Sequence, residues 1–499
     1  MIQYKTPESV GISSINIKKY IDMLEKKGLS THNIIFAKGN NIIFEHYWRP
    51  FEQNFLHRMY SVSKSFVSLA IGFLEQDGLV ALDDKIENYF QTEFKEQSDT
   101  NMKNQTIRNM LTMSTAKEDR YWFNDKPKDR VKYYFKNNDP YSRKPGLLFQ
   151  YDSSGSFVLG ALVERLTGMQ LMDYLRVKLF DKIGVSKGAY CLKCPGGYSW
   201  SDSGILCTPL DLLRVARFVM NEGEWDGEQI LNSKYIKAAV SKQIDNNEYG
   251  IDNCMTQGYG YLFWRTYNNS FFFNGMGCQF AVCVPDKDMI MVYNGDNQGN
   301  NLAKEIIING FFECVVNSTE DRAIEGDNIK SLEEYCANLT LASTKGEKHS
   351  EFAEEINNVV YELDNNLMGI TKIKLTFCGE SGKFEYTNMQ GDKEIIFGMC
   401  ENVLGRFPQE GYSDLVGTVY EPGNFYRCAA SAAWIEPKKL FIKVQIIDKY
   451  FGNLNITISF GDYDDVSIRM EKFAEDFMNE YQGFASGTKI FRTFRGRGE

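Results

Sequence analysis

Two side chains that could act together as nucleophile and base lie one helical turn apart near residue 60. They belong to the segment HRMYSVSKSF, residues 57–66. Residues i and i+3 of a helix share a face, so Ser61 and Lys64 meet if a helix begins near Ser61. A serine hydroxyl is a weak nucleophile and needs a base. A lysine can be that base only when burial or neighbouring cations lower its pKa.

The S-x-x-K pattern also has a simple structural explanation. Ser61 or Ser63 can cap the helix while Lys64 points into solvent, and chance supplies the pattern often. In the catalytic interpretation, the partial positive charge of the helix N-terminus favours negative charge on the attacking oxygen. Both interpretations predict a helix with one apolar face, formed by Phe66, Leu69, Ala70, Phe73 and Leu74.

Several segments, taken in order, resemble the serine β-lactamase and penicillin-recognising superfamily, in its class C and esterase branch. The turn GLVALDD, residues 78–84, follows the S-x-x-K segment, and TIRNMLTMSTA and GILCTPLDLLRVARFVMNEGEWDGEQIL come later. The resemblance covers most of residues 5–315. It implies a sheet flanked by helices, with a helical subdomain, and an acyl-enzyme formed on Ser61 with Lys64 as its activating partner.

The second motif of that branch is Y-x-N or Y-x-S, and FQYDSSGS matches it at Tyr151 and Ser153. The resemblance implies that Tyr151 relays a proton beside Lys64 and that Ser153 hydrogen-bonds to the substrate or to Lys64. A phenol held beside a lysine cation loses its proton more readily, which agrees with this role. The alternative for Tyr151 is an ordinary half-buried aromatic residue, in a chain with 28 tyrosines.

A second candidate for a polar motif is Ser201-Asp202-Ser203, which looks like the S-D-N motif of other branches. It comes too late in the order of motifs, and we interpret it as a loop lining the pocket. A Ser-His-Asp triad is also disfavoured. His57 is the only histidine near the proposed nucleophile, and the chain lacks the G-x-S-x-G elbow.

The third motif, normally K-T-G or H-x-G on a strand beside the site, departs from the β-lactamase pattern. Aligning the glycine in FFFNGMGCQF gives Phe273-Asn274-Gly275, without a lysine or histidine in the first position. The G-x-G-x-Q run resembles the 6-aminohexanoate-dimer hydrolase group of amidases and esterases. Glycine lets a strand approach an acyl group closely. The backbone N–H groups of Met276 and Ser61 are then the expected oxyanion donors. The alternatives are a glycine-rich bulge and a register slipped by one or two residues.

A pocket without the cationic residue is expected to disfavour carboxylate-bearing β-lactams. Phe273, Asn274 and Gly275 are candidate substrate-binding residues, and the nearby Tyr259 is a further candidate, with Tyr261 and Trp264. Most of these aromatic residues could equally belong to the core. We predict a serine hydrolase that cleaves an ester or amide of a small molecule. The alternatives are a D-amino-acid-specific peptidase or weak β-lactamase, and a non-catalytic acyl-ligand binding protein of the same fold.

The elements that must position these motifs predict a fold of the α/β class, of the α+β type. Apolar spacing predicts a helix from Ser14 to Gly28, and β-rich runs predict a hairpin about residues 38–41. Three strands are expected within 270–296, so that the first and last strands of one antiparallel sheet pair. Further helices are predicted at residues 106–113, after Tyr151, and at 208–223 and 302–316.

From about residue 320 the chain changes character. NSTEDRAIEGDN is a plausible linker, and a short helix is predicted at 329–340. Short strands then follow at the spacing of a β-barrel or sandwich, and the resemblance implies a lipocalin-like domain. They are IKLTFC, KFEYT, EIIFGMC, LVGTVY, LFIKVQII, LNITISF and VSIRM. We therefore predict domains 1–320 and 321–499, as expected for 499 residues.

Composition narrows the class of protein further. A net charge of −10 with mixed signs disfavours nucleic acid and anionic lipid as partners. Apolar runs fall short of the roughly 18 residues of a membrane helix, and the start MIQYKTPESV lacks signal-peptide features, so a cytoplasmic location is expected. The 11 cysteines are expected to be reduced, and the C-x-x-C of Cys191 and Cys194 lacks further zinc ligands. We predict no metal and no cofactor, and the sequence leaves the oligomeric state open.

Overall fold

The computed structural model describes residues 3–94, 99–117, 122–123, 125–136, 142–248, 250–326, 328–413, 415, 420–461, 464–475 and 477–490. The chain forms two compact units, and the first extends to Leu341 while the second begins at Ala342. The sequence placed this boundary at residue 320. The first unit continues because helix α12 (Ile329–Cys336) packs against α1 (Ser14–Lys26). Lys18 of α1 donates to the Ser331 hydroxyl at 3.1 Å.

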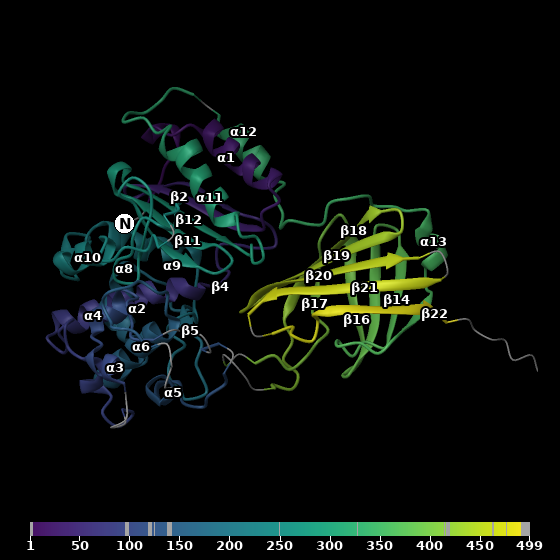
Figure 1. Ribbon diagram of the computed structural model, residues 1–499. Helices are drawn as coiled ribbons and strands as arrows, with labels where there is room; N and C mark the ends of the chain where they lie inside the picture. The colour runs from purple at the N-terminus through teal and green to yellow at the C-terminus, as the bar shows by residue number, and fades with distance from the viewer. Residues whose placement is uncertain are drawn as a thin grey trace, which may run out of the picture. The chain divides into compact units, whose positions relative to one another are not determined.

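The first unit is built on a seven-stranded sheet in the order β1-β3-β2-β12-β11-β10-β9 (Figure 1). The predicted pairing of the first and last long strands is confirmed, because β2 and β12 lie antiparallel with Ile35 opposite Val292. The predicted hairpin is also present. The strands are β1 (Gln3–Tyr4), β2 (Thr31–Lys38), β3 (Asn41–Tyr47), β9 (Trp264–Arg265), β10 (Phe271–Gly275), β11 (Gln279–Val284) and β12 (Met289–Gly295).

Helices cover both faces of this sheet (Figure 1). On one face, α1 and α11 (Ala303–Phe311) enclose a core in which Phe36 stacks on Phe311 with ring centroids 5.5 Å apart. On the other face, α9 (Pro209–Met220) packs on β11 and β12. Beyond it lie α2 (Ser63–Gln76) and α6 (Ser153–Thr167), which pack against each other and carry the motif residues.

Helix α1 begins at Ser14, as predicted, and Ser13 caps it by accepting the Ile15 N–H. Helix α2 begins at Ser63 rather than Ser61, after a 3₁₀ turn formed by Tyr60–Val62. The shorter elements of this unit are α3 (Thr100–Asn104), α4 (Ile107–Leu111), α5 (Arg130–Lys136), α7 (Leu171–Leu175), α8 (Asp181–Ile183), α10 (Ser233–Val240), β4 (His57–Arg58), β5 (Tyr190–Cys191), β6 (Ile205–Cys207), β7 (Glu224–Trp225) and β8 (Glu228–Gln229).

The second unit is a closed β-barrel. Its ten-stranded sheet has the order β16-β15-β14-β13-β22-β21-β20-β19-β18-β17. Parallel pairing of β16 with β18 closes nine of these strands into the barrel, and β17 pairs along β18. The elements are α13 (Phe352–Ile356), β13 (Val360–Leu363), β14 (Lys372–Cys378), β15 (Ser381–Asn388), β16 (Gly391–Met399), β17 (Val403–Arg406), β18 (Arg427–Glu436), β19 (Lys439–Ile447), β20 (Phe451–Phe460), β21 (Asp465–Ala474) and β22 (Gly483–Lys489).

Strand β18 was not among the strands predicted from the sequence. Its centre, AASAAW, is rich in alanine, which has low strand propensity, yet this part of the strand is buried. Aromatic residues also contribute to the barrel core, where the Tyr386 and Tyr481 hydroxyls lie 2.8 Å apart. The strand predicted for LVGTVY falls mostly outside the described residues.

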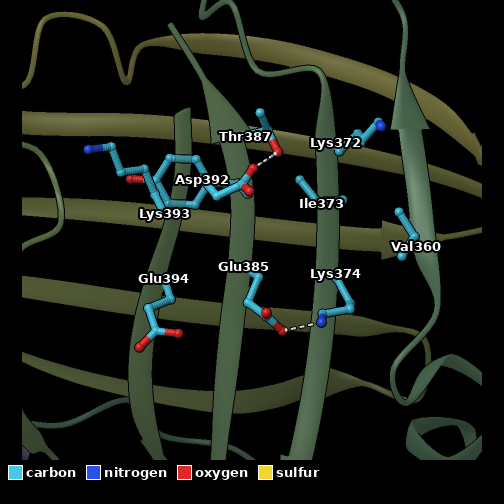
Figure 2. A pocket seen from close by; sticks show the side chains of 10 residues that line it. Val360, Lys372, Ile373, Lys374, Glu385, Thr387, Asp392, Lys393 and Glu394 are labelled. Carbon is cyan, nitrogen blue, oxygen red and sulfur yellow. Dashed lines mark hydrogen bonds and ion pairs between the residues drawn. The ribbon is translucent and has the colours of Figure 1, made fainter. Parts of the chain in front are cut away.

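The barrel carries a surface pocket of about 390 Å³ along strands β13–β16 (Figure 2). Polar side chains across it pair with each other. Lys374 forms an ion pair with Glu385 at 2.8 Å, and the Thr387 hydroxyl donates to Asp392 at 2.7 Å. Because these pairs satisfy one another, we assign the pocket no chemistry.

None of the helices among the described residues has both the length and the apolar character of a membrane-spanning segment.

Candidate active site

Ser61 and Lys64 meet although α2 begins later than predicted. The 3₁₀ turn at Tyr60–Val62 continues directly into the helix, so the Lys64 Nζ lies 3.0 Å from the Ser61 Oγ. Lys64 is 1% exposed, whereas Ser61 is half-buried and keeps part of its surface accessible to solvent. A buried amine against an accessible hydroxyl is the arrangement that the S-x-x-K pattern predicted. The simple capping interpretation, with Lys64 in solvent, is wrong.

The residue before Ser61 has an unusual backbone conformation. Tyr60 has φ of 47°, a value that bulky residues rarely adopt and that is found where surrounding contacts enforce it. The Tyr60 ring is buried, and the Arg58 guanidinium lies 4.5 Å from its centroid. Arg58 is itself fully buried and donates through Nε to the Ser203 carbonyl at 3.1 Å. These contacts hold the turn that presents Ser61.

The loop that contains Ser203 also contacts the proposed base. Lys64 Nζ donates to the main-chain carbonyl of Asp202 at 2.8 Å. The chain that follows is tied to the start of α2, because the Ile205 N–H donates to the Ser63 hydroxyl at 3.0 Å. Ser201-Asp202-Ser203 therefore lies at the site, as the loop interpretation predicted. Its contribution to Lys64 is a carbonyl oxygen, which residue types do not reveal.

Tyr151 lies beside the lysine, just before α6. The Lys64 Nζ is 5.0 Å from the centroid of the Tyr151 ring. The ring stacks on Trp264 at a centroid distance of 5.6 Å, and the Gln150 N–H donates to the Met113 carbonyl at 2.7 Å. The structure thus brings Ser61, Lys64 and Tyr151 together. Ser153 opens α6 and is 3% exposed.

The third-motif strand β10 runs against the turn that carries Ser61. A Cβ on Gly275 would collide with the Met59 carbonyl, so only glycine allows this close approach. The hairpin that follows is fixed by Gln279, which is fully buried. Its Nε2 donates to the carbonyls of Met276 at 3.2 Å and Gly295 at 2.6 Å. This explains the glutamine of the G-x-G-x-Q run.

The two amides proposed as oxyanion donors belong to these two elements. Met276 is half-buried, and Ser61 lies in the first turn of a helix, where N–H groups lack intrahelical acceptors. Neither N–H donates in the turn and loop hydrogen bonds found among the described residues. Asn274 is 7% exposed, with its amide nitrogen 3.9 Å from the Met255 sulfur.

Three of the predicted aromatic liners are core residues. Phe273 is fully buried and packs edge-on against Phe263 at 5.0 Å, so it presents no surface to a substrate. Tyr259 and Tyr261 are 1% and 2% exposed. Burial, reinforced by the neighbouring Tyr151, raises the pKa of Tyr259 well above its usual value. The half-buried Trp264 is the accessible aromatic residue of this segment, because β9 is an edge strand.

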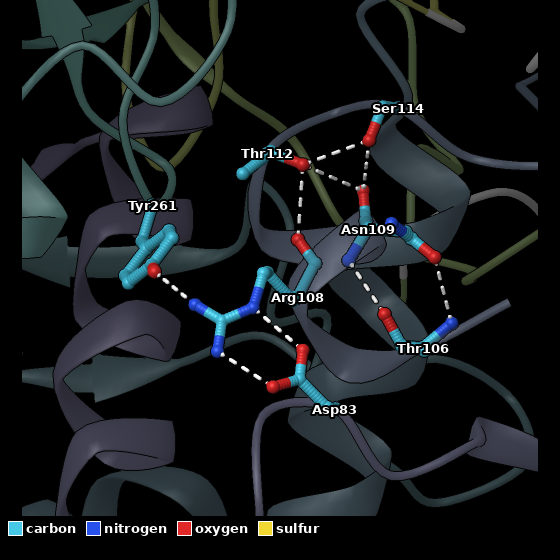
Figure 3. Close-up of polar contacts among 7 residues, drawn as sticks. All are labelled: Asp83, Thr106, Arg108, Asn109, Thr112, Ser114 and Tyr261. Carbon is cyan, nitrogen blue, oxygen red and sulfur yellow. Dashed lines mark hydrogen bonds and ion pairs between the residues drawn. The ribbon is translucent and has the colours of Figure 1, made fainter. Parts of the chain in front are cut away.

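A clamp fixes the segment that carries Trp264 (Figure 3). Arg108 binds Asp83 through two hydrogen bonds of 2.7 and 3.0 Å and donates to the Tyr261 hydroxyl at 2.5 Å. The next residue, Leu262, has φ of 61°, and its carbonyl accepts the Ser65 hydroxyl at 2.8 Å. Ser65 adjoins Lys64, so the clamp joins α4, α2 and the Trp264 segment. The sequence alone does not reveal this role of Arg108, because it depends on residues distant in the chain.

A serine hydroxyl beside a buried amine, with a phenol and a glycine-rich strand nearby, is an arrangement suited to acyl transfer. The family model described as Beta-lactamase matches residues 17–305, which is more than half of the chain. The chain belongs to this family. The matched residues contain Ser61, Lys64 and Tyr151 as well as strands β10–β12, and they end before the barrel.

Individual relatives of this β-lactamase family chain are distant. The 6-aminohexanoate-dimer hydrolase of Paenarthrobacter ureafaciens is 22% identical over 269 residues, which are 50% of this chain and 67% of that protein. Penicillin-binding protein 4* of Bacillus subtilis is 24% identical over 189 residues, 34% of this chain and 40% of its own. A solved putative 6-aminohexanoate-dimer hydrolase from Bacillus anthracis gives a TM-score of 0.51 at 17% identity, covering 62% of this chain and 86% of that one. At this identity, the solved structure supports the fold alone.

Proposed function

We propose that this β-lactamase family protein is a serine hydrolase that cleaves an ester or amide bond of a small molecule through an acyl-enzyme on Ser61. The observation that carries the proposal is the placement of Lys64. Its Nζ lies 3.0 Å from the Ser61 Oγ and 2.8 Å from the Asp202 carbonyl, next to the Tyr151 ring. Family membership and the likeness to a 6-aminohexanoate-dimer hydrolase support the reaction class.

The Asp202 carbonyl orients the base. A carbonyl oxygen can only accept, so one N–H of Lys64 stays directed at it. In the neutral amine, the lone pair is then free to accept the Ser61 proton as the Oγ attacks the substrate carbonyl carbon. Tyr151, whose ring lies beside Lys64, relays this proton to the leaving oxygen or nitrogen as that bond breaks. Water later attacks the acyl-enzyme, and the same groups return the proton to Ser61.

The oxyanion of each tetrahedral intermediate is held by the N–H groups of Ser61 and Met276. Two preorganised donors of this kind contribute a large share of the rate in acyl transfer. Gln279 supports the Met276 amide by bonding to the same residue's carbonyl. The close packing of Gly275 against Met59 keeps the two donors on adjoining elements.

The substrate is expected to be uncharged near the third motif. The position that carries lysine or histidine in β-lactam-recognising members is Phe273, which is buried and apolar. A substrate carboxylate there lacks its charge-assisted partner. We therefore favour esters or amides over β-lactams. A D-amino-acid-specific peptidase or weak β-lactamase would be revealed by turnover of D-peptides or nitrocefin. A non-catalytic acyl-ligand binder would bind but not turn over any of these compounds.

A fluorophosphonate probe tests the proposal directly, because it labels only an activated serine. Wild-type protein should be labelled, and Ser61→Ala should not. Ser68→Ala is the matched control. It removes a buried hydroxyl of helix α2 that lies 3.3 Å from the Tyr235 hydroxyl, and the protein should keep the label. Equal labelling of wild type and Ser61→Ala would overturn the mechanism.

We also propose that the C-terminal barrel is lipocalin-like. A closed barrel of mainly antiparallel strands supports this assignment. Fluorescence titration of the whole protein and of the Ser61→Ala variant with a lipophilic dye would test whether the barrel binds apolar ligands. Dye fluorescence that rises without saturating at any concentration would contradict a lipocalin-type cavity.

A further inference from the structure

An apolar strip adjoins the catalytic tyrosine. Leu147 and Leu148, four and three residues before Tyr151, are 65% and 62% exposed. Phe149 follows them, and its ring lies 5.9 Å from that of Trp264. Trp264 in turn stacks on Tyr151. A single exposed leucine needs no explanation, but two neighbours continuous with accessible aromatic rings form a patch of the kind used in binding.

The strip is held in place at both ends. The Gly146 N–H donates to the Ser114 carbonyl at 2.8 Å, and the Gln150 N–H donates to the Met113 carbonyl at 2.7 Å. Gly146 has φ of 87°, so the turn before Leu147 suits glycine. At the other side of the strip, the Arg108 clamp fixes the segment that carries Trp264. A ligand would therefore meet a preformed surface.

The strip also has a defined chemistry and length. The segment from Pro145 to Tyr151, PGLLFQY, contains no charged residue, and the first charge at its outer end is Lys144. Four residues span about 14 Å at most when fully extended, and the bend at Leu147 and Leu148 makes the strip shorter, so it suits an alkyl chain of no more than medium length. Because the inner end is the Tyr151 ring, a chain lying on the strip would leave its carbonyl near Ser61.

We propose that the substrate carries an unbranched apolar chain of medium length, which lies along Leu147, Leu148, Phe149 and Trp264 while its ester or amide reaches Ser61. This inference rests on the proposed hydrolase function and adds the substrate class. The strip is the selective element, and the neutral third motif tolerates a substrate without a carboxylate.

A chain-length series measures the strip's contribution. With p-nitrophenyl esters from acetate to octanoate, kcat/KM of the wild type should rise about twofold per methylene, because a strip covers only one side of the chain and gives about half the effect of full burial. In the double variant Leu147→Ser/Leu148→Ser, the increase per methylene should largely vanish. Leu79→Ser is the control, since Leu79 is 46% exposed elsewhere in this unit, and it should keep the wild-type increase.

Binding without turnover separates this inference from the proposed function. Calorimetry on Ser61→Ala protein should show methyl octanoate, which carries its chain on the acyl side as in the kinetic series, binding at least tenfold tighter than methyl butanoate. The Leu147→Ser/Leu148→Ser changes in that background should abolish the difference. Equal affinities, or an unchanged chain-length dependence in the double variant, would overturn the proposed role of the strip in binding the substrate chain. Hydrolysis of every ester at one rate would support the hydrolase function and contradict binding along the strip. Chain-dependent binding without hydrolysis by the wild type would support binding along the strip and contradict the hydrolase function.

Discussion

Lys64 of helix α2 donates to the main-chain carbonyl of Asp202, 138 residues later in the chain, at 2.8 Å. The bond joins helix α2 to a loop beyond α6, and the same Nζ lies 3.0 Å from the Ser61 Oγ and 5.0 Å from the centroid of the Tyr151 ring. Because the acceptor is backbone, any residue type at position 202 could supply it. The site is therefore fixed by loop geometry as much as by its side chains.

Lys64 and Tyr151 are expected to act as one proton-transfer unit. Lys64→Ala and Tyr151→Phe should each slow acylation by several orders of magnitude, since each interrupts the same proton path. The double variant should lose less than the product of the two single losses. The rate of single-turnover acylation by a p-nitrophenyl ester is measured for the wild type, the two single variants and the double variant. Fully multiplicative losses would show that the residues act independently.

Arg108 is expected to position Trp264 and, through it, Tyr151. Arg108→Ala should lower kcat for acylation about tenfold, because it releases both Asp83 and Tyr261. In a Tyr151→Phe background the same change should have little further effect, since the ring would already lack its hydroxyl.

Arg165→Ala is the matched control for the clamp. Arg165 also forms a two-bond pair with a carboxylate, Glu93, at 2.5 and 3.1 Å. Both variants should lose roughly 1 kcal/mol of stability, reduced by solvent screening at these partly exposed pairs. Only Arg108→Ala should change acylation. A similar loss of kcat in Arg165→Ala would show that Arg108 only stabilises the fold and does not position Trp264.

His57 is expected to make the first unit sensitive to acid. Burial lowers the pKa of His57 to about 3, although its contact with the Phe55 carbonyl opposes the shift. Below about pH 6.5 the unfolded chain binds a proton at this histidine while the folded chain does not, so the free energy of unfolding falls as the pH falls. At pH 5 the loss from this group is on the order of 2 kcal/mol. Above pH 6.5 both states are neutral and the group has no effect.

The measurement is urea unfolding followed by tryptophan fluorescence between pH 7 and 4.5. Five of the six tryptophans lie at or before residue 264, so the signal reports on the first unit. His57→Gln should flatten the dependence on pH. His349→Gln removes an exposed histidine and should leave it unchanged. An identical pH dependence in wild type and His57→Gln would contradict the assignment.

Substrate charge provides the last prediction. A cation at the third motif favours an anionic substrate by roughly 1.5–3 kcal/mol, and Phe273 replaces that cation here. The wild type should therefore hydrolyse p-nitrophenyl butyrate with a kcat/KM at least tenfold above that for nitrocefin. Faster hydrolysis of nitrocefin would mean that another residue supplies the positive charge.

Much of the site was readable from the sequence. Ser61 and Lys64 are close in the chain, and helical spacing alone brings them together wherever a helix forms. The order of motifs placed Tyr151 beside them, and apolar periodicity gave the helices and the pairing of β2 with β12. Local spacing and pattern carry this information, because they depend on neighbouring residues.

What only the tertiary structure decided are the contacts between distant segments. Phe273 and Tyr259 are aromatic residues of the kind that line pockets, but the strands and helices packed around them bury both rings. Trp264 is accessible because β9 is an edge strand. The alanine-rich β18 is a strand because its neighbours in the barrel supply partners for its backbone. The Asp202 carbonyl and the Arg108 clamp depend on loops meeting helices far away in the chain. Burial and backbone hydrogen bonds are properties of the assembled fold, so residue type and spacing alone did not determine them.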